Sequence, residues 1–308
     1  PVVVLLHGSE DFSANDFNQL QRLLPAEGVG AFVFDKRGTG KSGGSYTQDF
    51  STLADDAVAA MTEARRMAGK RAGRVGYYGP SQGGWVAPLA ANRSKVDFVI
   101  VGFGLAVSPL EENRQEIRLE MTQKGYGAAE IAKAMEVAKA GEAIVTSNLK
   151  DGFDEFDAVR AKYRNEPWYK DLHGNYTYML LPLDKPTIQA SAERFVLGTP
   201  WKYDPMPALR ASKTPQVWIL GEDDLKAPSA DTGAKIAELG KAGKPFTLAM
   251  FPQTMHGIYE YETTASGEQV STRNADGFFA MLRDYALNGE LSGSYGAAKI
   301  TPPKGKKR

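Results

Sequence analysis

The strongest fold signal lies in the segment Arg74-Val75-Gly76-Tyr77-Tyr78-Gly79-Pro80-Ser81-Gln82-Gly83-Gly84-Trp85. A strand-like run ends in Gly79-Pro80-Ser81-Gln82-Gly83, and a helix-compatible run follows at residues 86–92. The G-x-S-x-G spacing is typical of a nucleophile elbow, a sharp strand-to-helix turn that holds a serine in a strained backbone conformation. Glycines suit both ends of such a turn because they lack a Cβ that would clash. The segment predicts that Ser81 is presented at the electropositive end of a helix.

Strand and helix patterns alternate along most of the chain. All-apolar runs such as residues 2–6 are typical of parallel strands covered on both faces. The alternation predicts an α/β fold with a doubly wound, mostly parallel sheet. Further strands are expected at residues 31–34, 96–103, 216–220 and 246–251, and helices at 17–28, 50–67, 229–240 and 275–287.

The alternation stops for about a hundred residues after the strand expected at 96–103. This stretch is mostly helical, with aromatic and proline-rich connections, and it is far longer than an ordinary crossover. It predicts an inserted helical cap. The expected domains are the first part of the core at 1–107, the cap at 108–207, the second part of the core at 208–290, and a flexible C-terminal tail at 291–308.

Composition limits the classes of function. Lys+Arg and Asp+Glu both number 37, so the formal net charge is zero, which argues against nucleic acid as a partner. The absence of cysteine excludes disulfides, thiolate catalysis and cysteine-ligated zinc. No apolar run approaches the roughly 20 residues of a membrane span. The composition makes no prediction about the oligomeric state.

The chain begins inside a strand of the buried type, at Pro1 and Val2. Domains rarely start within their sheet, so we expect upstream residues, either further strands or an export signal. Together with the absence of cysteine, this favours an exported or periplasmic location over a cytoplasmic one.

A serine hydroxyl needs an oriented base to become a nucleophile, and the chain offers three histidines. His256 follows the last strand of the sheet, at the carboxyl edge where open parallel sheets bind their ligands. His7 lies in the loop after the first strand, where we expect it to organise the loop, and His173 lies in the expected cap. His256 is therefore the expected base.

The acid that orients the base is expected after a different strand. Glu222, Asp223 and Asp224 directly follow the strand at 216–220, and Asp223 and Asp224 are both candidates. The oxyanion of an acyl intermediate needs fixed N–H donors, each contributing about 3–4 kcal/mol. The backbone N–H groups of Gln82 and Ser9 are the expected donors.

Two other motifs have simpler explanations. Gly40-Lys41-Ser42 resembles the end of a phosphate-binding loop, but the motif requires glycine at position 35, which is aspartate. Glu111 and Glu112 could bind the amino group of a peptide, but Ser108-Pro109-Leu110-Glu111 is typical of a capped helix N-terminus. Helix initiation is the better interpretation.

Aromatic residues are frequent in the expected cap. They could line an acyl pocket, or they could pack the cap itself. The candidates for a substrate pocket are Trp168, Tyr176, Tyr178 and Trp201.

These motifs occur in the order found in the α/β-hydrolase family, and the sequence resembles in particular bacterial capped serine hydrolases of the carboxylesterase or serine aminopeptidase-like kind. The resemblance covers residues 1–105 and 213–288 and implies that Ser81 is the nucleophile, Asp224 the acid and His256 the base. Two features depart from the family pattern. The family's opening strands are absent before Pro1, and Pro80 stands where many members carry histidine or another side chain.

The sequence thus predicts a serine hydrolase that cleaves small to medium carboxylic esters through an acyl-Ser81 intermediate, without metal or cofactor. The expected partner is a small-molecule ester or other acyl substrate. An exopeptidase, amidase or thioesterase on the same triad is the alternative. A hydrolase fold without activity, used as a binding module, is a more remote alternative.

Overall fold

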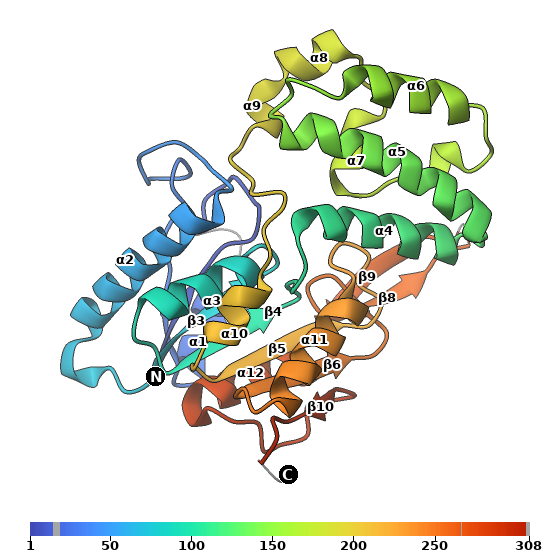
Figure 1. The fold of residues 1–308 in the computed structure, drawn as a ribbon. Coiled ribbons are helices and arrows are strands. Elements are labelled where there is room, and N and C mark those ends of the chain that lie inside the picture. The colour runs from blue at the N-terminus through green and yellow to red at the C-terminus, as the bar shows by residue number, and fades with distance from the viewer. Residues whose placement is uncertain (15–18, 266, 306–308) are drawn as a thin grey trace. The chain divides into compact units, whose positions relative to one another are not determined.

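The computed structural model describes residues 1–14, 19–265 and 267–305. The chain forms two compact units (Figure 1). The first, here called the core unit, comprises Pro1–Ala106, Pro205–Asp224 and Ser229–Arg308. The second, the helical unit, comprises Val107–Asp204 and Leu225–Pro228.

The core unit is built on a seven-stranded sheet with the order β10-β6-β5-β4-β3-β1-β2. Every neighbouring pair is parallel except β10 with β6. The predicted α/β fold with a mostly parallel sheet is therefore confirmed. The strands are β1 (Val2–Leu5), β2 (Gly30–Phe32), β3 (Val75–Pro80), β4 (Phe98–Gly102), β5 (Gln216–Gly221), β6 (Phe246–Phe251) and β10 (Lys299–Thr301).

Helices cover both faces of this sheet because successive side chains of each strand point to opposite faces. Val217 and Ile219 of β5 join a buried cluster with α1 (Leu20–Ala26) and α12 (Phe278–Asn288). On the other face, Tyr77 of β3 reaches the Ala57 carbonyl of α2 (Phe50–Ala68). That face also carries α3 (Gly83–Arg93) and α11 (Ser229–Lys241), with the short helices η1 (Gly69–Arg71) and α10 (Met206–Ala211) nearby.

A second, three-stranded sheet, which was not expected from the sequence, follows β6. It contains β7 (Thr254–Met255), β8 (Tyr259–Thr263) and β9 (Gln269–Asn274), all antiparallel. β8 and β9 are mostly exposed and polar, so they lack the apolar runs from which the strands of the main sheet were predicted. This sheet adjoins the loop that carries His256.

The described part of the predicted flexible tail, residues 291–305, instead packs on the core unit. β10 pairs antiparallel with β6, and Ile300 and Ala298 contact the same apolar cluster as α12. Tyr295 is buried, and its hydroxyl donates to Asp284 at 2.9 Å. Apolar contacts and this hydrogen bond thus fix a segment that is rich in glycine, serine and lysine, a composition typical of a linker.

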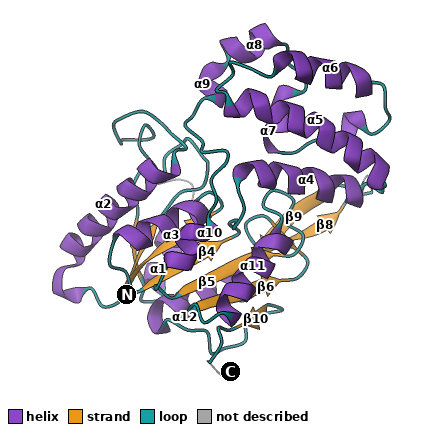
Figure 2. Cartoon of the chain, viewed as in Figure 1, coloured by secondary structure: helices purple, strands orange, loops and turns teal. Residues whose placement is uncertain are grey.

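Helices joined by loops make up the helical unit, as Figure 2 shows. Its apolar core includes Ile117, Val137, Phe156 and Trp168. The predicted helix start is confirmed, since Ser108 Oγ accepts from Glu111 N at 3.2 Å and Pro109 is the first helical residue. The elements are α4 (Pro109–Gln123), α5 (Ala128–Thr146), α6 (Phe153–Tyr163), η2 (Tyr169–Asp171), α7 (Asn175–Leu180), α8 (Lys185–Ala190) and α9 (Ala192–Phe195).

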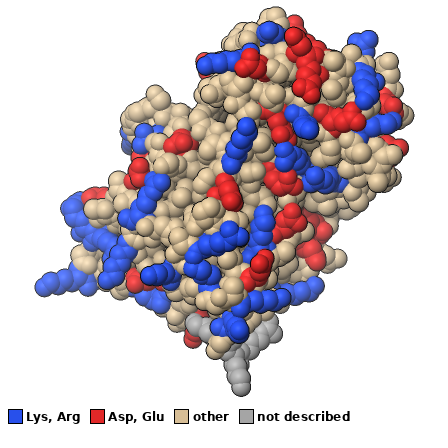
Figure 3. All heavy atoms as spheres, in the orientation of Figure 1, with Lys and Arg blue, Asp and Glu red and all other residues tan. Residues whose placement is uncertain are grey.

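Acidic and basic side chains are interspersed on the face of the molecule seen in Figure 3, in keeping with the formal net charge of zero. None of the helices in the described residues has both the length and the apolar character needed to cross a membrane.

Candidate active site

The sharp strand-to-helix turn at Ser81 forms as the sequence predicts. β3 ends at Pro80, α3 begins at Gly83, and Ser81 lies between them with φ +50°. A non-glycine residue in this left-handed region is strained, and such strain is common at functional sites. Glycine is required at position 79, because a Cβ there would lie 2.3 Å from the Gly83 carbonyl oxygen. Tight packing of strand against helix therefore maintains the strained serine.

His256 and Asp224 come together at the carboxyl edge of the sheet. The imidazole Nδ1 lies 2.9 Å from Oδ2 of Asp224 and 3.2 Å from Oδ1. The Asp224 side chain is 1% exposed, whereas that of His256 is 24% exposed. A carboxylate facing Nδ1 favours the tautomer with its proton on that nitrogen, which leaves Nε2 able to accept a proton.

The neighbouring carboxylate, Asp223, is turned elsewhere. Its Oδ2 accepts from the hydroxyl of Tyr261 in β8 at 2.9 Å, and its backbone N–H donates to the Thr254 carbonyl at 3.0 Å. The contacts thus distinguish the two aspartates that were both candidates for the acid. Asp223 connects the acid loop to the small sheet, and Asp224 contacts the imidazole.

Phe103 and Asn274 hold the histidine loop from two further sides. The Phe103 ring meets the imidazole edge to face, with centroids 4.8 Å apart and an interplanar angle of 71°. Phe103 directly follows β4 and has φ +41°. Asn274 of β9 donates from Nδ2 to the Gly257 carbonyl at 2.9 Å. Sequence reasoning missed both residues, although a bulky residue directly after a central strand was a usable signal for Phe103.

Ser81 and His256 line one cavity of about 440 Å³, together with Ser9. No hydrogen bond joins the Ser81 hydroxyl to the imidazole within the residues that the structure describes. Such bonds often form only when substrate is bound. The apolar part of the lining is contributed by Leu20, Tyr78, Phe103, Tyr259, Phe278 and Phe279.

The two expected oxyanion donors are available. Over the described part of the chain, neither Ser9 N nor Gln82 N donates to a protein acceptor. The N–H of the adjacent Gly8 does donate, to Glu10 Oε1 at 3.0 Å. Glu10 also lines the cavity, and burial raises the pKa of its carboxyl group. Sequence reasoning did not single out this carboxylate beside Ser81.

The loop after β2 contains the Gly40-Lys41-Ser42 motif that was considered as a phosphate site. In the structure the Asp35 side chain accepts the hydrogen bonds that such a site would offer to phosphate. The Asp35 carboxylate accepts from Ser13 Oγ at 2.7 Å, Ala14 N at 3.1 Å and Lys41 N at 2.8 Å. The hydrogen bond from Lys41 N contributes most to lowering the pKa of this carboxyl group. Gly40 is required here, since a Cβ would lie 2.2 Å from Asp35 Oδ2. The loop is thus organised around an internal carboxylate.

The two other histidines have different surroundings. His7 Nε2 donates to the Phe34 carbonyl at 2.6 Å, and burial lowers the pKa of its ring to about 4, so the ring is neutral at pH 7. This contact ties the loop after β1 to the one after β2. His173 belongs to the helical unit, where its ring stacks on Tyr178.

The four aromatic residues considered as pocket residues all lie in the helical unit. Trp168 and Tyr176 are buried in that unit's own core, and Trp201 packs edge to face on Tyr176. These contacts support the interpretation that the three side chains pack the helical unit itself. Tyr178 is 58% exposed.

Glu111 is engaged within its own helix. Its carboxylate oxygens lie 3.1 Å from Arg114 Nη1 and 3.0 Å from Arg118 Nη1. A carboxylate paired with two arginines is a poor receptor for a substrate amine, because the arginines already neutralise its charge.

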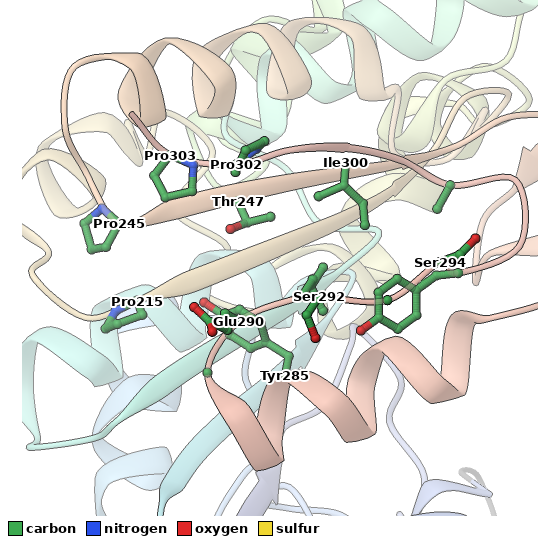
Figure 4. A pocket seen from close by; sticks show the side chains of 15 residues that line it. Pro215, Pro245, Thr247, Tyr285, Glu290, Ser292, Ser294, Ile300, Pro302 and Pro303 are labelled. Atoms are coloured by element: carbon green, nitrogen blue, oxygen red, sulfur yellow. The ribbon is translucent and has the colours of Figure 1, made fainter. Parts of the chain in front are cut away.

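A second cavity, of about 460 Å³, lies at the other end of the strands (Figure 4). Pro215 and Pro245, which precede β5 and β6, line it together with Tyr285 and Ile300. It lies at the amino ends of the strands, whereas Ser81, Asp224 and His256 follow carboxyl ends. It contains none of the residues predicted for the site.

The fold is that of an α/β-hydrolase. The family model described as serine aminopeptidase, S33, matches residues 1–263, and the chain belongs to this family of hydrolases. No curated protein matches the sequence.

Solved structures with similar folds include hydrolases of several kinds. An esterase from Pyrococcus furiosus is 17% identical and aligns over 83% of this chain and 74% of its own, with a TM-score of 0.50. A monoacylglycerol lipase from Paleococcus ferrophilus is 20% identical over 94% and 95% of the two chains, with a TM-score of 0.49. A proline iminopeptidase from Mycobacterium smegmatis is 18% identical over 83% and 82%, with a TM-score of 0.47.

Proposed function

We propose that this protein is a serine esterase that cleaves carboxylic esters through an acyl-Ser81 intermediate, with Asp224 as the acid and His256 as the base. The observation that carries the proposal is the contact between the buried Asp224 carboxylate and His256, whose ring shares a cavity with the strained Ser81. The backbone N–H groups of Gln82 and Ser9 are the proposed oxyanion donors.

Acylation begins when the Ser81 hydroxyl attacks the carbonyl carbon of the ester. The hydroxyl proton passes to Nε2 of His256, and the Asp224 carboxylate stabilises the resulting imidazolium through Nδ1–H. The carbonyl oxygen becomes an oxyanion, and the N–H groups of Gln82 and Ser9 donate to it. The intermediate collapses when the ester C–O bond breaks and the leaving alcohol takes the proton from Nε2.

Deacylation repeats these steps with water as the nucleophile. His256 removes a proton from water, the hydroxide adds to the acyl carbon, and the bond to Ser81 Oγ breaks as that oxygen regains the proton. The carboxylic acid leaves and the enzyme is restored. Each role is filled by a residue of the core unit.

The size and the largely apolar lining of the cavity favour uncharged substrates of small to medium size. Its volume of about 440 Å³ is in the range of small-molecule sites, and aromatic side chains such as Phe103, Phe278 and Phe279 line it. Apolar acyl groups gain from contact with these rings.

One observation favours aminopeptidase or amidase activity as a second candidate. Glu10 provides a carboxylate inside the Ser81 cavity, where it could bind the ammonium group of an aminoacyl substrate. Glu111, the carboxylate considered from the sequence, is already paired with arginines.

A substrate panel separates these candidates. Purified protein is assayed with nitrophenyl acetate, butyrate and octanoate, with the matching thioesters, and with aminoacyl nitroanilides. We expect the short and medium esters to have the highest kcat/KM. Activity on the anilides alone would refute the esterase proposal and leave the aminopeptidase candidate.

A further inference from the structure

A lysine is buried between the two loops that carry the proposed oxyanion donors. Lys36 is only 2% exposed. Its Nζ donates to the Gly8 carbonyl at 3.0 Å and to Gln82 Oε1 at 2.9 Å. Buried lysines are rare because removing an ammonium group from water is costly, so a role for the side chain is expected.

The surroundings of Lys36 account for its charged form. Two of its three N–H bonds point to the oxygens of Gly8 and Gln82, and the ammonium also lies 4.9 Å from the centre of the Tyr46 ring, within cation–π range. The carboxylates of Glu10 and Asp11 favour the positive charge. The ammonium is thus held in place by neutral acceptors, an aromatic face and two nearby carboxylates.

The bond to the Gly8 carbonyl determines where the Ser9 N–H points. The Gly8 C=O and the Ser9 N–H belong to one peptide group, which is planar and trans, so they point in opposite directions. A lysine that fixes the carbonyl therefore fixes the amide. Tyr46 holds the next peptide group, since its hydroxyl donates to the Ser9 carbonyl at 2.6 Å.

The bond to Gln82 connects this loop to the elbow. Gln82 provides the other proposed donor through its backbone, while its buried side chain accepts from Lys36. One ammonium group thus joins the residues that supply both donors, over sequence separations of 28 and 46 residues.

We propose that Lys36 is a positioning residue of the oxyanion hole, which orients the Ser9 amide and fixes it relative to Gln82. The proposal rests on the proposed serine hydrolase function. Lys36 does not touch the substrate itself, and it acts through the two backbone amides. Its effect is therefore expected in the transition state, where the oxyanion exists, and not in substrate binding.

The test compares Lys36→Met with Lys41→Met, an exposed lysine of the same loop, using nitrophenyl butyrate. We expect Lys36→Met to lower kcat about tenfold to a hundredfold, somewhat less than the loss of a whole donor, with KM within about twofold. Affinity for a trifluoromethyl ketone, which forms a tetrahedral adduct, falls by a similar factor. The Lys41 variant keeps the wild-type kcat.

A second variant covers the case in which Lys36→Met fails to fold. Gln82→Met removes the side-chain oxygen that accepts from Lys36 and keeps the backbone N–H of residue 82, and we expect it to lower kcat by about threefold to tenfold with KM unchanged. A folded Lys36→Met protein with wild-type kcat, or a loss confined to KM, contradicts the role of Lys36. If Lys36→Met does not fold, a Gln82→Met protein with wild-type kcat contradicts the role of Lys36.

The two proposals fail in different ways. A wild-type protein that hydrolyses none of the substrates contradicts the proposed function, and the role of Lys36 falls with it. An active wild type whose Lys36 variant is equally active contradicts only the role of Lys36.

Discussion

His256 Nδ1 lies 2.9 Å from Oδ2 of Asp224, a carboxyl group with 1% of its side chain exposed. A buried carboxylate beside one nitrogen fixes the imidazole's orientation and stabilises its protonated form during turnover. Asp224 follows β5 of the main sheet and His256 follows β7 of the small sheet, so the contact joins two segments that are distant in sequence.

Asp224→Asn should lower kcat for an ester by a factor of about 10⁴, because the amide favours the wrong imidazole tautomer. Asp223→Asn is the matched control, since the same change one residue earlier affects a side chain bonded to Tyr261. We expect its kcat to stay within roughly threefold of wild type, because it loses at most one hydrogen bond remote from the imidazole. Steady-state kinetics on both variants make the comparison, and similar losses would contradict the assignment of the acid.

Backbone strain at Ser81 should be measurable as stability. With φ at +50°, alanine at this position keeps the strain and glycine relieves it. We expect Ser81→Gly to exceed Ser81→Ala in free energy of unfolding by about 1 kcal/mol, while both lack activity. Urea unfolding at 25 °C measures the difference. Equal stabilities would show that the elbow stores no strain at this residue.

Activity should decline in part above pH 8. Burial lowers the pKa of Lys36 to about 8, and the neutral amine makes weaker hydrogen bonds to Gly8 and Gln82. Other charged groups nearby are Glu10, Asp11 and Asp56 of α2, which is paired with Arg37. The measurement is kcat against pH for wild type and Lys36→Met, and the decline near pH 8 should be absent from the variant.

Loss of folded protein does not explain a decline of kcat above pH 8. The folded pKa of Lys36 lies below its ordinary value of 10.5, so the unfolded chain binds more protons between about pH 8 and 10.5. The contribution of Lys36 to the free energy of unfolding therefore rises with pH in this window. A profile that declines identically in wild type and variant would assign the effect to another group.

Glu10 should affect substrate charge preference. Glu10→Gln keeps an oxygen acceptor for Gly8 N but removes the negative charge from the cavity. If the protein cleaves aminoacyl anilides, we expect their kcat/KM to fall about tenfold, equivalent to ~1.4 kcal/mol, with little change for neutral esters. Asp11→Asn, which removes an exposed carboxylate nearby, is the control. Equal effects on both substrate types would exclude Glu10 as the amine receptor.

Sequence information was sufficient for the features that depend on local patterns. Apolar runs gave the parallel strands, and Gly79 and Gly83 identified the elbow, because steric limits there allow few other residues. His256 could be selected because few histidines exist and only one follows the last parallel strand.

Features that depend on tertiary contacts were not visible in the sequence. Asp223 and Asp224 follow the same strand, and only their partners, Tyr261 and His256, distinguish them. The role of Lys36 depends on acceptors 28 and 46 residues away, so within Asp35-Lys36-Arg37 it resembled any polar loop residue. The exposed strands β8 and β9 lack an apolar pattern, and the segment around Tyr295 is fixed by contacts with distant residues.

The most direct test of the central claim is labelling by a fluorophosphonate probe, which reacts with activated serines. We expect the wild-type protein to be labelled at Ser81, as located by peptide mass spectrometry, and Ser81→Ala to remain unlabelled. An inactive hydrolase fold that serves as a binding module would not be labelled. Labelling of Ser81→Ala, or of another serine in the wild type, would contradict the account of Ser81 as the nucleophile.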